Sequence, residues 1–427
     1  MDVRAPAMAL AIEHPGSSAA FAERLLNFVL FITVLLSSIA FIEPSPHDVM
    51  MFVLLITCIT ARVRFDRKLV PLLLLIAAWL VGGLLSLAQV ADQPKAIQYT
   101  GTSAYLGTAA VVFACLFSDG NSVRLSILRR AYILAALIAT AAGFIGFFHL
   151  LPGSHIFLLN DRVSATFKDS NVYGPFLIFP LLLLIISLFT RGIRLSRLAM
   201  VFALLAGLFL SFSRGAWTHF VVSVTVSTVL LLVVTADGRM RVRIILLSVV
   251  AVIGASLLVL ALLSINSVHD VFLARAQVFQ PYDVGPGGRF GLQELALGAI
   301  LDHPNGMGPN EFGIMFGGQQ HDVYMQVFLD YGWLGGAAYA TMVLATLVFG
   351  LAVIRVRTPW QNYLIAAYGG FVGEVVEGFI IDSDHWRHFF LLLGLIWGLT
   401  VATINFHRRQ AWEIMGDRRV AMLPLPS

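Results

Sequence analysis

Charged residues are scarce in this sequence. Of its 427 residues, only 12% are Asp, Glu, Lys or Arg, whereas 58% are hydrophobic. This balance excludes an ordinary soluble domain and is typical of a chain that crosses a membrane many times. The formal net charge is only +4, so the composition gives no reason to expect a nucleic-acid partner.

Cysteine is also rare, and the familiar soluble motifs are missing. The two cysteines, Cys58 and Cys115, both lie inside apolar segments, which excludes a disulfide framework and is typical of buried thiols that act as small hydrophobic groups. The chain has no glycine-rich dinucleotide or Walker loop, no His-Glu-x-x-His and no cysteine pair with metal-binding spacing. We find no internal repeat.

Apolar runs long enough to span a bilayer dominate what is present. A spanning helix needs about 20 mostly apolar residues, and the sequence predicts about twelve such segments. The first run comes late and lacks a small-residue cleavage site, so we interpret it as a retained span behind a disordered tail, residues 1–24. The weakest, 48–61, is short. The predicted spans are 25–42, 48–61, 69–90, 98–117, 131–150, 173–190, 197–213, 216–234, 244–265, 333–354, 361–381 and 388–405.

The lysines and arginines alternate from one loop to the next. Most of the 28 lie in one set of loops, which the positive-inside rule assigns to the cytoplasm together with both termini and the tail 406–427. The long 266–332 loop then faces outside, after nine spans in 25–265 and before three in 333–405. The basic residues on the outer side are Lys95, Arg162, Lys168, Arg214, Arg275, Arg289 and Arg387.

The 266–332 loop holds the strongest candidates for chemistry. Arg289 follows glycines and opens a predicted helix, about 290–301, with an apolar face of Leu292, Leu295, Leu297 and Ile300. A helix N-terminus with a guanidinium group is suited to bind phosphate. The alternative is an arginine that snorkels to lipid headgroups.

His321 lies where the next long helix should begin. A histidine at that place is suited to act as a general base, although for a lone histidine a solvated surface position is the more ordinary interpretation. Asp322 is a candidate N-cap and could influence the pKa of the histidine.

Further polar residues flank the predicted spans. Arg214 lies between two spans, where Gly215 would permit a tight turn, and is either a second outward cation or an interfacial anchor beside Trp217. Arg162 and Asn171 belong to a polar rim before a span, or to a simple helix cap. Glu374 and Glu377, three residues apart, would share one face inside a span and face a cavity or a partner.

An acidic loop follows. Asp382, Asp384 and His385 have the potential to bind a divalent metal, although acidic loop residues near an arginine are more often solvated or ion-paired.

In this order, these segments resemble the superfamily of O-antigen ligases and Wzy-type polysaccharide polymerases. The resemblance is carried by DRVSATFKDSNVYGPFL (161–177), SFSRGAW (211–217), the run from Gly285 to Gly313 with its Pro304–Asn310 turn, and HDVYMQVFLDYGWLGG (321–336). It implies an all-α integral membrane protein of about twelve transmembrane helices with a GT-C-like fold and one large periplasmic loop that contains short helices.

The resemblance also implies an activity. Family members are inverting, metal-independent glycosyltransferases that take a glycan from undecaprenyl pyrophosphate at the periplasmic face of the bacterial inner membrane, with no cofactor. Ligases pass it to lipid A–core, and polymerases pass it to another repeat unit. Arg214 and Arg289, with Arg162, correspond to donor-pyrophosphate-binding arginines, and His321 to the base. Supporting positions are Asp322, Asn171, Asn310, Glu374 and Glu377.

One departure and two rival functions stay open. The family usually has Asn after the histidine, where this chain has Asp322. A rival interpretation is a glycolipid flippase or secondary carrier, because twelve spans with both ends inside is also a carrier layout. Another is a metal-dependent glycosyltransferase that uses Asp382, Asp384 and His385. The motifs do not separate ligase from polymerase.

Overall fold

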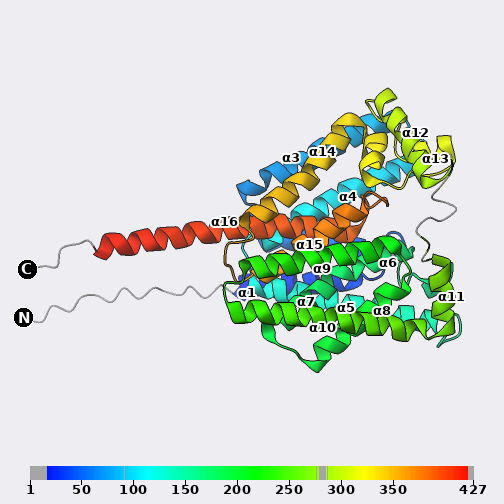
Figure 1. The fold of residues 1–427 in the computed structure, drawn as a ribbon. Helices are drawn as coiled ribbons and strands as arrows, with labels where there is room; N and C mark the ends of the chain where they lie inside the picture. The colour runs from blue at the N-terminus through cyan, green and yellow to red at the C-terminus, as the bar shows by residue number, and fades with distance from the viewer. Residues whose placement is uncertain (1–16, 91, 276, 278–284, 286, 422–427) are drawn as a thin grey trace, which may run out of the picture.

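A computed structural model describes residues 17–421 except 91, 276, 278–284 and 286, with side chains from residue 18 to residue 410. The described chain is almost entirely helical, as Figure 1 shows. The first half contains α1 (Ser17–Leu36), α2 (Pro46–Thr60), η1 (Arg67–Leu69), α3 (Val70–Leu87), α4 (Pro94–Phe117), α5 (Ser122–Phe147), η2 (Ser154–Phe157), α6 (Ser170–Phe176), α7 (Ile178–Arg191) and α8 (Leu195–Leu210). The second half contains α9 (Arg214–Val234), α10 (Gly238–Leu263), α11 (Asn266–Arg275), α12 (Arg289–Asp302), α13 (Glu311–Phe316), α14 (Val323–Val353), α15 (Gln361–Glu377) and α16 (Arg387–Ala421).

The only strands among the described residues are β1 (Leu158–Leu159) and β2 (Arg162–Val163). They pair antiparallel, with Leu158 opposite Val163. This short hairpin lies between α5 and α6, and it holds Arg162 at the end of the bundle.

Nine helices in the described part of the chain are long and apolar enough to cross a membrane. They coincide with nine of the predicted spans, so the chain is a multi-pass membrane protein. Shorter helices, α2, α8 and α15, occupy the other three predicted spans. The full count of twelve stays a prediction, because a helix of 15 to 17 residues falls short of the length that spans a bilayer upright.

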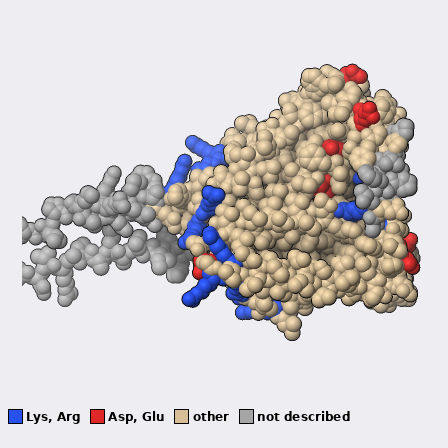
Figure 2. Space-filling model, in the orientation of Figure 1, with Lys and Arg blue, Asp and Glu red and all other residues tan. Residues whose placement is uncertain are grey.

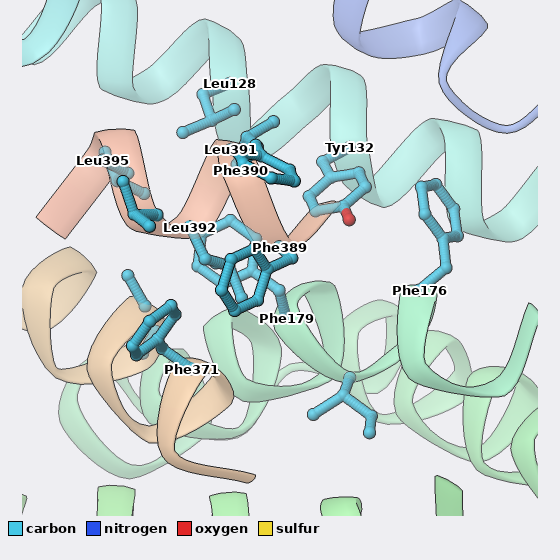
Figure 3. Close-up of a cluster of buried hydrophobic side chains, with 14 of the residues drawn as sticks. Leu128, Tyr132, Phe176, Phe179, Phe371, Phe389, Phe390, Leu391, Leu392 and Leu395 are labelled. Atoms are coloured by element: carbon cyan, nitrogen blue, oxygen red, sulfur yellow. The ribbon is translucent and has the colours of Figure 1, made fainter. Parts of the chain in front are cut away.

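The core lies around the first half of α16. Phe389 and Phe390 are buried there, and Figure 3 shows them between Tyr132 of α5 and Phe371 of α15. The ring centroids of Phe371 and Phe389 are 5.2 Å apart. Since lipid tails are as apolar as these side chains, close packing rather than removal from water holds such helices together.

The two ends of the bundle differ in their structure and charge. α1 begins and α16 ends at one end, whereas α11, α12 and α13 lie at the other (Figure 1). In the view of Figure 2, most Lys and Arg side chains gather at the end where α1 begins, and Asp and Glu side chains lie mainly at the opposite end. The short helices α11, α12 and α13 belong to the 266–332 segment, and they lie near the starts of α6, α9 and α14.

The first and last helices extend beyond the predicted spans. α1 begins at Ser17 rather than Leu25, and α16 continues to Ala421, where we expected a tail from residue 406. Ser17–Glu23 carries good helix formers, and Glu23 forms an ion pair of 3.0 Å with Arg124 of α5. Residues 1–16 of the predicted disordered tail lie outside the described residues.

Candidate active site

A cavity of about 1050 Å³ opens at the end of the bundle that carries α11–α13. Its walls come from the hairpin and α6, from the start of α9, from α11 and α12, and from the segments before α14 and after α15. Six of the predicted site residues line it: Arg162, Asn171, Arg214, Arg289, His321 and Glu377. They are brought together from separate elements across more than half of the chain.

Arg162 is held at the cavity wall by two hydrogen bonds. Its Nε donates to the carbonyl oxygen of Ser211 at 3.0 Å, and its Nη2 donates to Oδ1 of Asn171 at 2.6 Å. Asn171 is itself fixed at the start of α6, where its N–H donates to the capping side chain of Asp169. The segment therefore caps α6, as one interpretation predicted, and it also orients a guanidinium group at the cavity. That this rim faces a ligand stays a prediction.

Arg214 is the first residue of α9, and its Nη1 donates to the carbonyl oxygen of Gln277 at 2.8 Å.

The tight turn before α9 was predicted at Gly215, and this prediction is wrong. The chain reverses at Ser211–Ser213, where Phe212 has a φ of 45°, and Gly215 lies inside α9. A Cβ atom on Gly215 would lie 2.6 Å from Oε1 of Glu377, so the glycine allows the close approach of Glu377.

Arg289 begins α12, one residue earlier than predicted, behind the extended N-cap residue Gly288. Gly287, Arg289 and Phe290 all line the cavity, so the N-terminal end of the helix borders it. The predicted apolar face is partly wrong, because Leu295 and Leu297 are exposed. The buried face is Leu292, Ala296 and Ala299, which follow the i, i+4, i+7 spacing of one helix face.

His321 lies between two fixed residues. The Gln320 side chain before it is fully buried and donates to Oε1 of Gln326 at 2.6 Å. Asp322 after it caps α14, with Oδ1 accepting from the N–H of Met325 at 2.9 Å, as predicted. His321 has a φ of 51°, which is uncommon for a residue with a side chain. Its ring is nearly half exposed and lines the cavity.

Asp382 is the partner of His321. Its Oδ2 lies 3.0 Å from Nδ1 of His321. Because an ionised carboxylate only accepts hydrogen bonds, Nδ1 carries a proton, and in the neutral ring Nε2 then has a lone pair. The sequence marked Asp382 only as a candidate metal ligand, and no local signal connects two residues that are 61 positions apart.

Positive charge predominates around the cavity. Arg162, Arg214, Arg275 and Arg289 line it, against Asp169, Glu377 and Asp382. Arg275, in the last turn of α11, was noted in the sequence only as an outward cation. Guanidinium groups gathered with a helix N-terminus are suited to bind a phosphate-containing anion.

Comparison with known families agrees with this geometry. Residues 198–340 match the model of the O-antigen ligase family. Over this segment the chain is similar to O-antigen ligases. No curated protein matches the chain. The matched segment runs from α8 to the middle of α14 and contains Arg214, Arg289 and His321, whereas Arg162, Asn171, Glu377 and Asp382 lie outside it.

Three predicted supporting residues do not line this cavity. Asp322 serves as the cap of α14. Asn310, with a φ of 68°, precedes α13, and its N–H donates to Oδ1 of Asp330 at 3.1 Å. Glu374 is fully buried in α15, with Oε1 at 3.3 Å from Nε2 of His388. Glu374 and Glu377 therefore contact different histidines, and only Glu377 lines the cavity.

The residues of the acidic loop contact different partners. Asp382 faces His321, whereas Asp384 accepts a hydrogen bond from the hydroxyl of Tyr99. His385 is held by the hydroxyl of Ser103 at 2.8 Å. Burial raises the pKa of Asp384 and lowers the pKa of His385. Among the described residues, no three His, Cys, Asp or Glu side chains are grouped as metal ligands would be.

Proposed function

We propose that this protein transfers a glycan from undecaprenyl pyrophosphate to an acceptor hydroxyl at the periplasmic face of the bacterial inner membrane. The observation that carries this proposal is the cavity that joins Arg162, Arg214 and Arg289 with His321. The acceptor is lipid A–core if the protein is a ligase, and another glycan if it is a polymerase.

The orientation rests on charge. Lys and Arg side chains gather at the end where α1 begins and α16 ends (Figure 2), and the positive-inside rule assigns that end to the cytoplasm. The cavity, at the opposite end with α11–α13, then opens to the periplasm. Both termini are cytoplasmic in this arrangement.

The arginines act on the leaving group. When the bond between the anomeric carbon and the diphosphate oxygen breaks, the bonding electrons stay on the diphosphate and its negative charge grows. Fixed guanidinium groups at a partly buried site stabilise that charge more in the transition state than in the ground state. The hydrogen bonds of Arg162 to Ser211 and Asn171 hold one guanidinium group in place before the substrate arrives, so little reorganisation is needed.

His321 acts on the acceptor. The hydroxyl oxygen forms the new bond to the anomeric carbon from the side opposite the diphosphate, which inverts the configuration. Its proton passes to Nε2 of His321, while Nδ1 keeps its hydrogen bond to Asp382. General-base help of this kind accelerates a reaction by about 10²- to 10⁴-fold. Since the charge is carried by arginines, the proposed reaction needs no metal.

The test uses the purified full chain in detergent with lipid-linked glycan and acceptor. We expect release of undecaprenyl pyrophosphate and a glycosylated acceptor, without a membrane gradient and in the presence of EDTA. A transporter would move the lipid in vesicles but release no undecaprenyl pyrophosphate. Loss of turnover with EDTA, restored by a divalent cation, would instead support the metal-dependent alternative. Polysaccharide bands in a deletion strain would distinguish ligation from polymerisation.

A further inference from the structure

A buried histidine fixes the side chain of Glu377 at the cavity. Glu377 is the last residue of α15 and is almost fully buried. Its Oε2 lies 2.7 Å from Nδ1 of His219, a buried residue of α9. The other ring nitrogen of His219, Nε2, lies 2.9 Å from the carbonyl oxygen of Gly370. The histidine therefore connects two positions of α15, and it holds Glu377 in one orientation.

The carbonyl of Gly370 decides which atoms carry protons. A carbonyl oxygen only accepts, so Nε2 of His219 carries a hydrogen. Nδ1 then either accepts a hydrogen from a protonated Glu377 or, as an imidazolium, donates one to an ionised Glu377. In both arrangements the shared proton lies between Nδ1 and Oε2. Oε1 is left as a hydrogen-bond acceptor in either case.

Oε1 has no hydrogen-bond partner among the described residues, although it is buried. It faces Gly215, where the missing side chain leaves it room. Gly215, Thr218 and Glu377 all line the cavity beside Arg214. A buried oxygen without a donor is costly to a folded protein. Because Glu377 lines the cavity, a ligand group that enters beside Gly215 is a source of the missing donor.

The chemistry of the donor substrate narrows the identity of that ligand group. A pyrophosphate diester has no O–H or N–H group to offer at neutral pH, and the arginines already suit its charge. The sugar that it carries has hydroxyl groups and, in amino sugars, an amide N–H.

We propose that Oε1 of Glu377 accepts a hydrogen bond from a hydroxyl or amide N–H of the sugar attached to the diphosphate. This inference rests on the proposed function, and it makes Glu377 a determinant of which donor glycan is accepted. A site built to bind a sugar O–H or N–H discriminates strongly against analogues that lack it.

Two substitutions at the same position separate hydrogen bonding from proton transfer. Glu377→Gln places a carbonyl oxygen at the Oε1 position and an amide that donates to Nδ1 of His219, so the acceptor is kept. Glu377→Leu removes it. Glu374→Leu is the matched control, since Glu374 is buried on the same helix but does not line the cavity.

The experiment measures binding of two probes to the purified full chain. One is undecaprenyl pyrophosphate without sugar, and the other is the lipid-linked glycan extracted from a strain that lacks this protein. We expect Glu377→Leu to reduce the preference for the glycan-bearing lipid by about 10- to 100-fold, with binding of the bare lipid unchanged. Glu377→Gln and Glu374→Leu should keep the preference within about threefold.

Three outcomes would overturn the inference. The first is an unchanged preference in Glu377→Leu, and the second is an equal loss in Glu374→Leu. The third is a turnover rate as low in Glu377→Gln as in Glu377→Leu, which would make the carboxylate a base. Failure of the proposed function is visible separately, because the wild-type protein would then release no undecaprenyl pyrophosphate from the lipid-linked glycan in the presence of acceptor.

Discussion

Asp382 holds the ring of His321 through a contact of 3.0 Å between Oδ2 and Nδ1. The two residues come from segments on either side of α14 and α15. The contact selects the tautomer in which Nε2 can accept a proton, which is the state that a general base requires. Both residues line the cavity with the arginines.

We expect His321→Asn to lower kcat by about 10²- to 10⁴-fold and to leave donor affinity nearly unchanged. Asparagine is chosen because it tolerates the positive φ of this position better than alanine does.

Asp382→Asn should lower kcat less, by about 10- to 100-fold, since it disturbs the orientation of the base and not the base itself. His303→Asn, in the same segment but outside the cavity, is the control. Turnover of lipid-linked donor by each purified variant is the measurement, and wild-type kcat in His321→Asn would contradict the assignment.

Replacement of the cavity arginines by lysine should be harmful, although less so than replacement by alanine. Lysine keeps the charge but loses the planar fork that binds two phosphate oxygens at once. We expect Arg214→Lys and Arg289→Lys to reduce kcat/KM by at least about tenfold, and the alanine variants by about 10²- to 10³-fold.

Arg239 at the start of α10 provides the matched control for the arginine variants. It belongs to the set of loops that the positive-inside rule assigns to the cytoplasm, and it lines no part of the cavity. Arg239→Lys and Arg239→Ala should keep kcat/KM within about twofold. A lysine variant of Arg289 with wild-type kinetics would show that a point charge suffices at that position.

Local signals predicted the elements that carry the site. Glycines before Arg289 placed the start of α12 within one residue, and Asp322 was identified as the cap of α14. The distribution of charge along the chain singled out the outward arginines, because the positive-inside rule makes such residues rare. These inferences depend on a few neighbouring residues or on which side of the membrane a loop lies.

Contacts between distant helices could not be predicted in this way. His219 and Glu377 are 158 positions apart and meet only because α9 packs against α15. Their spacing gives no hint of it, and Glu374, three residues from Glu377, meets His388 instead. The role of Gly215 was missed for the same reason, since the atom that needs the space belongs to another helix.

Asp322→Asn should stabilise the protein and keep its activity. Asn caps a helix as well as Asp does, and the side chain at 322 does not line the cavity. Burial raises the pKa of Asp322, and the charge of Asp382 adds to this effect against hydrogen bonds from the N–H groups of Met325 and Tyr324. A raised carboxyl pKa means that the folded protein disfavours the charged form. Asp322 therefore lowers stability as the pH rises from its pKa in the unfolded chain through its raised pKa in the folded protein.

The measurement is the unfolding midpoint of both proteins across pH 4 to 8 in one detergent. The midpoint of Asp322→Asn should exceed that of the wild type by about 1 to 2 °C at pH 8. The difference between the two midpoints should shrink as the pH falls, because the carboxyl group of Asp322 then becomes protonated in both the folded and the unfolded protein. A lower midpoint for Asp322→Asn at pH 8 would show that the ionised carboxylate is needed as the cap.

Gly332→Ala should destabilise the protein and displace the Pro304–Asn310 turn. Gly332 interrupts α14 with a φ of 67°, and a Cβ atom there would lie 2.6 Å from the carbonyl oxygen of Pro304. The turn is fixed at this kink by a hydrogen bond of 2.9 Å from the N–H of Trp333 to that same oxygen. Backbone strain and the steric clash together should cost about 2 to 4 kcal/mol.

Gly298→Ala is the control for this prediction. Gly298 lies in α12, and a Cβ atom there would have no neighbour within 4 Å. That variant should gain about 0.5 to 1 kcal/mol, because alanine favours the helix. Thermal unfolding of both variants in the same detergent measures the difference in stability.

Because the turn connects α12 to α13, Gly332→Ala should also weaken donor binding through Arg289. Wild-type stability and donor affinity in Gly332→Ala would show that the kink does not position the turn.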